Sequence, residues 1–364
     1  MSSIAFLLPS MAHGGAQKVF LEISSYLTEQ RINVVLISLD REGELLDRIP
    51  PDLKVVYLDD GLKTSGVKKR IIQWFRLRSY IADNKIGNLF STVTGMNIFT
   101  LSCFLFSKNI KITIREATPI ENTSSLFIKL FIWLLYKRSN RVICTSNYIK
   151  KQLNSFAGIH NSKIDVLPNP IDIDRIKKFS KLSLDLEHTF PSARFTIVAV
   201  GRLIRAKGFD TLIDALLIAR KAEDIKLIIV GEGPERLNLE NQIKRSLLEN
   251  DVLLAGYQAN PYPYILNSDL FVLPSRWEGY VNVVIEAMAL EVDVVVTDCN
   301  SAPGTLLKEK LNYPLVPTES PADLAHAILE NLLSPRDTTA FATLLKKNKL
   351  ANAIDLYFDD GDLL

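Results

Sequence analysis

Cysteine is scarce in this sequence. Of 364 residues only three are cysteine, Cys103, Cys144 and Cys299, and they lie far apart. There is no CxxC pair, and an odd number of cysteines cannot close a complete set of disulfides. These absences argue against a disulfide-stabilised secreted scaffold. We therefore expect a chain that folds in a reducing cytosol.

Long hydrophobic runs are also missing. The longest, Leu126 to Tyr136, is interrupted by Lys129 and is shorter than the about 20 residues that a membrane-spanning helix needs. The N-terminus enters a strand-like run, Ile4 to Leu8, with no basic region or small-residue cleavage site before it, so we expect no signal peptide. The net charge is only +2, and no repeated aromatic platform accompanies the basic residues. We therefore expect no nucleic-acid partner.

What the sequence does contain is enough apolar material for a folded protein of more than one core. Hydrophobic residues make up 47% of the chain and charged residues 23%, whereas disorder requires low hydrophobicity and high net charge. A single core stops growing near about 250 to 300 residues. Two domains are therefore expected.

Short β-branched runs alternate with helical patterns throughout, which predicts an α/β fold with parallel sheets. In the first half the predicted strands are SIAFLLP, INVVLISL, LKVVYL, NLFSTVT, IKITIRE, RVICTS and KIDVLP, and in the second half RFTIVAVG, IKLIIVGEG, VLLAG, LFVLPS and DVVVTD. Residues 168–192 lack a strong apolar periodicity and are interpreted as the linker. We predict an N-terminal domain over 1–170, a second domain over 171–337, and a C-terminal helical segment, 338–364, that packs back on the N-terminal domain.

The stretch SRWEGYVNVVIEAMAL, residues 275–290, places two glutamates around a mostly apolar segment. A helix is predicted from about Asn282, which puts Glu278 in the preceding loop and Glu286 inside the helix. Eight helical positions would separate them by about 12 Å, so a paired glycosidase mechanism is disfavoured. Two such acids suit the hydroxyl groups at the two ends of a nucleotide sugar, with backbone amides at the helix start facing an anion. The alternative is that both are ordinary solvated glutamates.

A second stretch, AVGRLIRAKGFDTLIDAL, runs from a strand through Gly201, Arg202, Lys207 and Gly208 into a helix. Glycine allows a phosphate to approach the backbone. Arg202 and Lys207 can neutralise a diphosphate, arginine through a bidentate contact and lysine as a point charge. Surface charges in a turn are the competing interpretation.

Other motifs give weaker signals. Gly14 and Gly15 follow the first strand and could form a second amide-lined cradle. The Gly231-Glu232-Gly233 segment has Arg236 where the dinucleotide fingerprint has its third glycine, so a nicotinamide dehydrogenase lacks its expected motif. Asp172 and Asp174 form a DxD pair, which could hold a metal, but the preceding Asn-Pro favours a turn and helix-cap role.

In these motifs the chain resembles glycosyltransferase family 4, which contains retaining, nucleotide-sugar-dependent enzymes of the GT-B fold. The segments that carry the resemblance are GGAQK, TSNYIKKQL, LPNPID, GRLIRAKG, IVGEGPER and EGYVNVVIEAMA. The resemblance extends from about residue 3 to about residue 334. It implies two Rossmann-like domains that face each other across a cleft.

The resemblance also implies roles for individual residues. Glu286 resembles the ribose-binding residue, Glu278 the residue at the donor sugar, and Arg202 and Lys207 the diphosphate clamp, so Glu278, Arg202 and Lys207 are the expected catalytic group. The expected donor-binding residues are Gly15, Arg202, Lys207, Tyr257, Glu278, Gly279, Tyr280, Val281 and Glu286. The expected acceptor-side residues are Gly14, Arg115, Glu116 and Asn169.

The resemblance implies a nucleotide-sugar donor and retention of configuration. We expect a UDP-sugar, with a GDP-sugar as the alternative. We expect neither a cofactor nor an essential metal, because two cationic side chains and a helix end can hold the diphosphate. The expected partner is a glycan acceptor linked to a polyprenyl diphosphate, as in bacterial capsule, O-antigen or exopolysaccharide assembly. Three features depart from the family pattern, one of them the segment Ala302-Pro303-Gly304-Thr305 in place of an acidic Gly-Pro motif. Arg115-Glu116 stands where the family often has a histidine, and Val281 stands where Pro or Gly is common. These departures leave the donor hexose open.

Two basic, aromatic segments are typical of interfacial helices. Residues 67–85 and SLFIKLFIWLLYKRSNR both combine apolar anchors with lysine and arginine. One interpretation is that both pack on the sheet with their lysines extended to solvent. The other is that the N-terminal domain rests on the anionic cytoplasmic face of the inner membrane. A soluble transferase acting on a small acceptor and a non-catalytic nucleotide-sugar-binding scaffold remain alternative functions.

Overall fold

The computed structural model describes most of the chain. The described residues are 3–12, 14–123, 125–182, 193–278, 280–299, 304, 307–308, 311 and 313–358. Gly279, which the sequence assigns to the donor site, and much of the predicted linker lie outside them.

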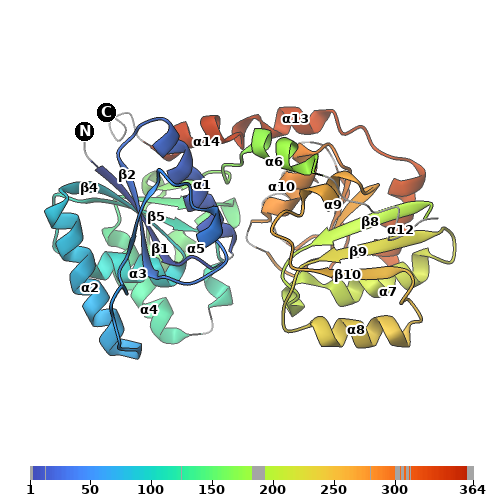
Figure 1. Ribbon diagram of the computed structural model, residues 1–364, viewed down its shortest axis with the longest axis horizontal. Helices are drawn as coiled ribbons and strands as arrows, with labels where there is room; N and C mark the ends of the chain where they lie inside the picture. Colours follow the sequence, from blue (N-terminus) through green and yellow to red (C-terminus); the bar gives the residue numbers. More distant parts are fainter. Residues whose placement is uncertain are drawn as a thin grey trace. The chain divides into compact units, whose positions relative to one another are not determined.

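Two parallel sheets form the framework, one in each half of the chain, and all twelve predicted strands are confirmed (Figure 1). The first sheet has seven strands in the order β3-β2-β1-β4-β5-β6-β7, and the second has five in the order β10-β9-β8-β11-β12. The strands of the first sheet are β1 Ser3–Ser10, β2 Val34–Asp40, β3 Lys54–Tyr57, β4 Ile86–Thr92, β5 Lys111–Glu116, β6 Arg141–Cys144 and β7 Ile164–Val166. Those of the second are β8 Phe195–Val200, β9 Ile225–Val230, β10 Val252–Gly256, β11 Leu270–Leu273 and β12 Val294–Val296.

Helices connect the strands and cover both faces of each sheet (Figure 1). The helices that follow strands β1 to β7 are α1 Gly15–Glu29, α2 Gly66–Asp83, α3 Thr94–Cys103, α4 Leu126–Leu135, α5 Asn147–Ala157 and α6 Ile173–Ser180. The later ones are α7 Phe209–Ala219, α8 Arg236–Arg245, α9 Tyr262–Leu266, α10 Asn282–Ala289, α12 Pro321–Leu333, α13 Ala340–Leu344 and α14 Leu350–Tyr357. Among the described residues, no helix combines the length and apolar character needed to cross a membrane.

Most strands are rich in apolar residues, which suits parallel strands buried by helices on both sides. Every residue of β2 is buried, and so is every residue of β11. On the first sheet, α2, α3, α4 and α5 cover one face, and α1 and α14 cover the other. In the second half, α7, α8 and α12 build the main core on β8, β9 and β11. Burial of these faces explains why the sequence pattern located the strands.

The chain divides into two compact units. The first comprises the described residues up to Ile171 together with those from Lys347 onward, and the second runs from Asp172 to Lys346. The division after Ile171 lies one residue beyond the boundary predicted from the sequence. The predicted C-terminal segment is split, because residues 338–346 remain with the second unit.

The predicted C-terminal helical segment, 338–364, is not one continuous helix in its described part. Two helices, α13 and α14, are separated by the 3-10 turn Leu345–Lys347 and by Asn348 and Lys349, and Lys349 forms an isolated parallel bridge with Ile171. The backbone oxygen of Asn348 accepts from Ile171 at 2.8 Å, and the backbone N–H of Leu350, the first residue of α14, donates to Ile171 at 3.0 Å. This pairing requires extended backbone, so the helix cannot continue through it.

The predicted linker contains α6, which the weak periodicity of residues 168–192 did not indicate. α6 buries Ile176 and packs against α9 and α10 of the second unit. Its N-cap is Asp172, whose Oδ1 accepts a hydrogen bond from the backbone N–H of Arg175 at 2.9 Å. The predicted cap role of Asp172 is therefore confirmed.

Candidate functional site

The second sheet reverses its strand order beside β8. From β8 the chain proceeds to β9 and β10 on one side, whereas β11 and β12 lie on the other. The loops that follow β8 and β11 leave adjacent strand ends and then diverge. A crevice at such a switch point is the usual ligand site of an open parallel sheet. The two motifs singled out in the sequence, around Lys207 and Glu278, occupy these two loops.

The structure brings Lys207 and Glu278 together. The Nζ of Lys207 donates a hydrogen bond to Oε1 of Glu278, and the two side chains are 17% and 14% exposed. The buried hydroxyl of Ser275 donates to the same oxygen at 2.9 Å. Ser275 is held in turn by its backbone oxygen, which accepts from Thr297 Oγ1 at 2.6 Å. The carboxylate is thus fixed next to a cation at the switch point.

Arg276 joins the two loops to each other. Its guanidinium makes a bidentate contact with Asp210 at 2.8 and 2.7 Å and donates to the backbone oxygen of Arg205 at 2.8 Å. It also pairs with Glu319 at 2.8 Å. Hydrogen bonding to Asp210 raises the pKa of Arg276 above its ordinary value, so the cation persists at any working pH. This clamp sets the position of the Lys207 loop relative to the Glu278 loop.

Arg276, Ser275 and Asp210 were not among the site residues predicted from the sequence. Arg276 stands inside the SRWEGY motif, but its role depends on Asp210, which is 66 residues away in the sequence. No local pattern links the two positions. The only available signal was a charged residue at the end of a buried strand.

Glycines in these loops serve mainly the packing of backbone on backbone. At Gly208, where φ is +64°, an added Cβ would overlap the carbonyl oxygen of Pro274, and at Gly231, in the neighbouring loop after β9, it would overlap that of Gly201. Of the glycines, Gly201 and Gly208 were the ones predicted from the sequence to let a phosphate approach the backbone. At Gly201 an added Cβ would lie 3.2 Å from Cε of Lys207, so the lysine stem lies across this glycine. Gly201 therefore leaves room for the lysine.

The remaining predicted donor residues have varied exposure. Arg202 directly follows Gly201 and is exposed, and Tyr257 follows β10 and is 43% exposed. Tyr280 is partly exposed, whereas Val281 is the buried residue before α10. Glu286 is only 4% exposed, on the second turn of α10. The sequence correctly placed Glu278 before this helix and Glu286 within it.

The predicted residues of the first unit separate into two groups. Gly14 and Gly15 lie at the start of α1, after the carboxyl end of β1, and Gly15 is exposed. Arg115, Glu116 and Asn169 are at most 2% exposed. The described structure therefore gives these three no solvent-facing surface for an acceptor.

Arg115 and Glu116 belong to an internal polar network. Arg115 donates to Thr92 Oγ1 at 3.2 Å and to Asn169 Oδ1. Glu116 accepts from the Tyr136 hydroxyl at 2.7 Å and from Thr94 Oγ1 at 3.0 Å. Burial raises the pKa of Glu116, although these hydrogen bonds oppose the shift. In this structure the network ties β4 and β5 to the segment that leaves the first unit.

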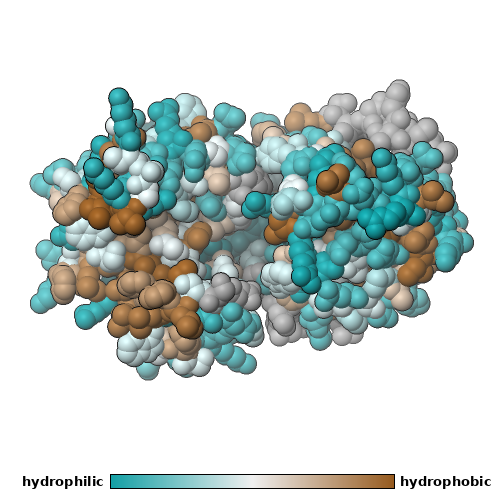
Figure 2. All heavy atoms as spheres, turned by 90° about the horizontal axis from the view of Figure 1, so that it is seen from below, coloured by the Kyte–Doolittle hydropathy of each residue, from teal (hydrophilic) through white to brown (hydrophobic). Residues whose placement is uncertain are grey.

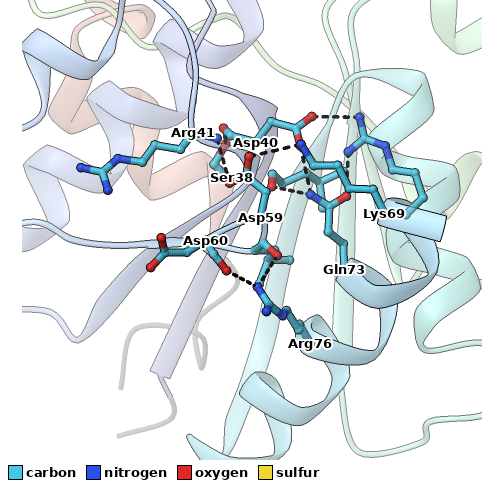
Figure 3. A network of polar contacts seen from close by, with 11 residues as sticks. Ser38, Asp40, Arg41, Asp59, Asp60, Lys69, Gln73 and Arg76 are labelled. Atoms are coloured by element: carbon cyan, nitrogen blue, oxygen red, sulfur yellow. Dashed lines mark hydrogen bonds and ion pairs between the residues drawn. The ribbon is translucent and has the colours of Figure 1, made fainter. Parts of the chain in front are cut away.

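A further network at the carboxyl ends of β2 and β3 holds α2 in place (Figure 3). Asp40 pairs with Lys69 and with Arg70, each at 2.9 Å, and accepts from Gln73 at 3.0 Å. Lys69 also reaches Asp59 at 3.2 Å. The acids and cations neutralise one another, so this cluster fixes the helix position.

Two family models match the chain, one for each unit. Residues 13–175 match the model for Glycosyltransferase Family 4, and residues 183–348 match the model for Glycosyl transferases group 1. Together the matches span most of the sequence.

Named relatives show the same similarity. An N-acetylgalactosaminyltransferase of Campylobacter jejuni, whose name gives a diphospho-undecaprenol-linked saccharide as its substrate, is 27% identical over 83% of this chain and 82% of its own length. An uncharacterized glycosyltransferase of Methanocaldococcus jannaschii is 32% identical over 54% of this chain, and the match spans about half of that relative, 51%. Among solved structures, Anabaena HepE in complex with UDP aligns with a TM-score of 0.80 at 19% identity, covering 98% of both chains. This last likeness concerns the fold.

Proposed function

Because this chain belongs to the family 4 glycosyltransferases, we propose that it moves a hexose or N-acetylhexosamine from a UDP-sugar to a lipid-linked glycan acceptor, with retention of configuration. The setting would be bacterial surface-polysaccharide assembly at the cytoplasmic face of the inner membrane. Support for this setting comes from the Campylobacter jejuni relative, which acts on a diphospho-undecaprenol-linked substrate, and from the Staphylococcus aureus capsular polysaccharide enzyme, 25% identical over 79% of this chain. The fold shared with a UDP-bound protein supports the donor class.

The observation that carries the proposal is the pairing of Lys207 with Glu278 at the switch point of the second sheet. A lone exposed lysine would bind anions weakly in water, whereas this one is largely buried beside a fixed carboxylate. A diphosphate that binds at this switch point would compete with Glu278 for Lys207. The carboxylate is then available to accept hydrogen bonds from sugar hydroxyls.

The transfer step requires stabilisation of a leaving diphosphate. The acceptor oxygen forms a bond to the anomeric carbon while the bond from that carbon to the β-phosphate oxygen breaks, and the electron pair leaves on the phosphate. The acceptor proton passes to the departing phosphate oxygen. Negative charge therefore grows on the diphosphate, which Lys207 and Arg202 would bind, and a cation held in place, as Lys207 is, contributes most of its effect in the transition state. No protein nucleophile is required.

We further propose that the two cations make an essential metal unnecessary. The test is turnover with and without EDTA, measured as UDP release. Undiminished turnover in EDTA is expected. A loss that Mg²⁺ or Mn²⁺ restores would contradict this part of the proposal.

Donor binding is tested by thermal shift with a panel of UDP- and GDP-sugars. A ligand at about 100 times its Kd stabilises the folded state by about 2.7 kcal/mol, which raises the Tm by several degrees. UDP-sugars are expected to raise the Tm, and Arg202→Gln is expected to weaken the shift. The matched control is Arg205→Gln, an exposed arginine three residues away. A panel in which only GDP-sugars bind, or none bind, would contradict the proposed donor.

A further inference from the structure

Helix α4 of the first unit exposes an unusual amount of apolar surface. Only Ile132 and Leu135 of its ten residues are buried. Leu126 and Phe127 are 79% and 77% exposed. The other exposed apolar side chains are Ile128, Leu130, Phe131, Trp133 and Leu134. A water-facing helix of a monomeric protein would carry polar residues at most of these positions.

The apolar surface extends beyond α4 alone. Helix α3 contacts both α2 and α4, so the three helices form one layer on the sheet. Figure 2 views the molecule from below, the side toward which α4 and the lower part of α2 lie in Figure 1, and shows apolar side chains gathered over the first unit. Val67, Ile71 and Phe75 on α2 and Phe106 after α3 are also exposed. The layer thus presents an apolar face that no described element covers.

The charged residues on α4 and in the turn that follows it have one sign. Lys129 lies on the helix, and Lys137 and Arg138 follow its C-terminus. Lys137 lies over the ring of Trp133, 4.7 Å from its centroid. The sequence contains no aspartate or glutamate between Glu121 and Asp165. The apolar face is therefore bordered by cations that have no nearby acid in their own segment.

The basic residues of α2, within the segment 67–85, are engaged differently from those around α4. Lys69 and Arg70 are engaged by Asp40 (Figure 3). Arg76 donates to the backbone oxygen of Asp60 at 2.7 Å, and Arg78 binds the backbone oxygen of Cys103. These cations hold α2 to its own unit. The cations available to a partner are mainly those around α4.

We propose that α4 docks this protein on an anionic lipid bilayer, lying in the plane of the surface with its apolar side chains inserted and its cations at the headgroups. Aromatic and leucine anchors beside lysine and arginine fit such an interface, and each basic residue near an anionic surface adds attraction. The inference rests on the proposed function, because a lipid-linked acceptor would lie in the same surface.

A second copy of the chain fits this face less well. In a two-fold symmetric contact the same patch meets itself. Lys129, Lys137 and Arg138 would then face their own copies, with no acid in the segment to pair with them. Like charges brought together in this way oppose association.

The first experiment is vesicle flotation of the full chain. The probes are vesicles of phosphatidylcholine alone and vesicles with an equal amount of phosphatidylglycerol. Flotation is expected with the mixed vesicles only, and it should weaken as salt rises because salt screens the attraction. Equal flotation with both compositions, or none with either, would overturn the proposal.

Matched variants locate the surface. Lys137→Gln with Arg138→Gln should lower partitioning about fivefold per cation, or roughly 25-fold for the pair. The control is Lys244→Gln with Arg245→Gln, two exposed cations in the last turn of α8. Phe127→Gln with Trp133→Gln should abolish flotation, whereas Leu237→Gln, on exposed apolar surface of α8, should not. Equal effects of test and control variants would overturn the proposal.

A spectroscopic readout reports insertion directly. The chain has three tryptophans, so Trp74→Phe with Trp277→Phe leaves Trp133 as the only indole. Its emission should shift to shorter wavelength on mixed vesicles and should be quenched by brominated lipid. No shift in a sample that floats would show that another surface binds. A concentration-dependent dimer that Phe127→Gln dissociates, with no vesicle binding, would assign the face to a second copy.

Failure here is distinguishable from failure of the proposed function. The α4 variants should keep the thermal shift caused by UDP-sugar and the turnover of a water-soluble acceptor analogue. Vesicle binding without any UDP-sugar shift would refute the proposed donor and leave the docking surface intact. A normal UDP-sugar shift without vesicle binding would refute the docking surface alone.

Discussion

Lys207 donates a hydrogen bond to Glu278 across 71 residues of sequence, at the point where the second sheet reverses its strand order. This contact places a cation and a carboxylate at the carboxyl ends of adjacent strands, where open parallel sheets bind ligands. The arrangement is prepared before a ligand arrives, because Ser275 and the Arg276 clamp fix both loops. Preorganisation of this kind lowers the cost of stabilising a charged transition state.

Glu278→Gln should lower turnover about 10²- to 10³-fold while the fold is preserved. The amide keeps the size of the side chain and an acceptor for Ser275, but it removes the charge that positions Lys207 and receives sugar hydroxyls. Turnover by UDP release and Tm are measured together. Glu249→Gln, at an exposed position of the same unit, is the control. Retained turnover in Glu278→Gln would remove Glu278 from the mechanism.

Lys207→Met should abolish most of the Tm increase caused by UDP and lower turnover by a similar factor of about 10²- to 10³-fold. The methionine keeps much of the apolar stem that lies over Gly201 but loses the charge. Lys221→Met, an exposed lysine after α7, serves as the control. An unchanged UDP shift in the Lys207 variant would mean that the diphosphate binds elsewhere.

Arg276→Leu should lower stability by about 1 to 2 kcal/mol and should also reduce turnover. The stability cost is moderate because Asp210 and Glu319 are 48% and 60% exposed and water screens the pairs. Turnover should fall further than stability explains, since the clamp positions Lys207 relative to Glu278. Urea unfolding and UDP release are the two measurements. Glu319→Gln, which removes only the most exposed contact, should change both little.

The stability contribution of Asp40 should depend on pH. Burial by itself raises the pKa of Asp40, but hydrogen bonds from Lys69 and Gln73 and the charge of Arg70 outweigh it, so the pKa lies below the ordinary value of 3.8. For a carboxyl whose pKa is lower in the folded state, the stabilisation is complete at pH values above the pKa of the unfolded state. It is lost as pH falls through the pKa of the folded state.

Asp40→Asn should therefore cost about 1 to 3 kcal/mol near neutral pH and progressively less as pH falls below 3.8. The free energy of unfolding in urea, measured over pH for both proteins, gives the difference. Asp60→Asn, at an exposed neighbouring position, is the control. A difference that stays constant through the acid range would contradict the electrostatic explanation.

Ile354→Ala on α14 should destabilise the protein by about 2 to 5 kcal/mol. Ile354 is 2% exposed and packs in the core beneath α1, with Tyr357 and Phe358. Leu356→Ala, two residues away and 42% exposed, should cost much less. Similar costs for the two variants would show that α14 does not contribute a core face to the first unit.

The sequence by itself determined the strands, the two sheets and the order of the loops that carry the site. Parallel strands buried on both faces must be continuous apolar runs, so β2 and β11 could be recognised from a few residues. The start of α10 could likewise be predicted at about Asn282, which placed Glu278 before the helix and Glu286 within it.

Tertiary structure alone decided which distant residues meet and which surfaces remain exposed. The partners of Lys207 and Arg276 lie 71 and 66 residues away, and no local periodicity encodes such contacts. Arg115 was expected on the acceptor side but is buried. It donates to Thr92 and Asn169, which come from separate segments that no local pattern connects to it. The apolar residues of α4 match those of a core helix in composition, yet only Ile132 and Leu135 are buried. Side-chain composition states what a helix could bury, whereas the packing of neighbouring elements sets what it does bury.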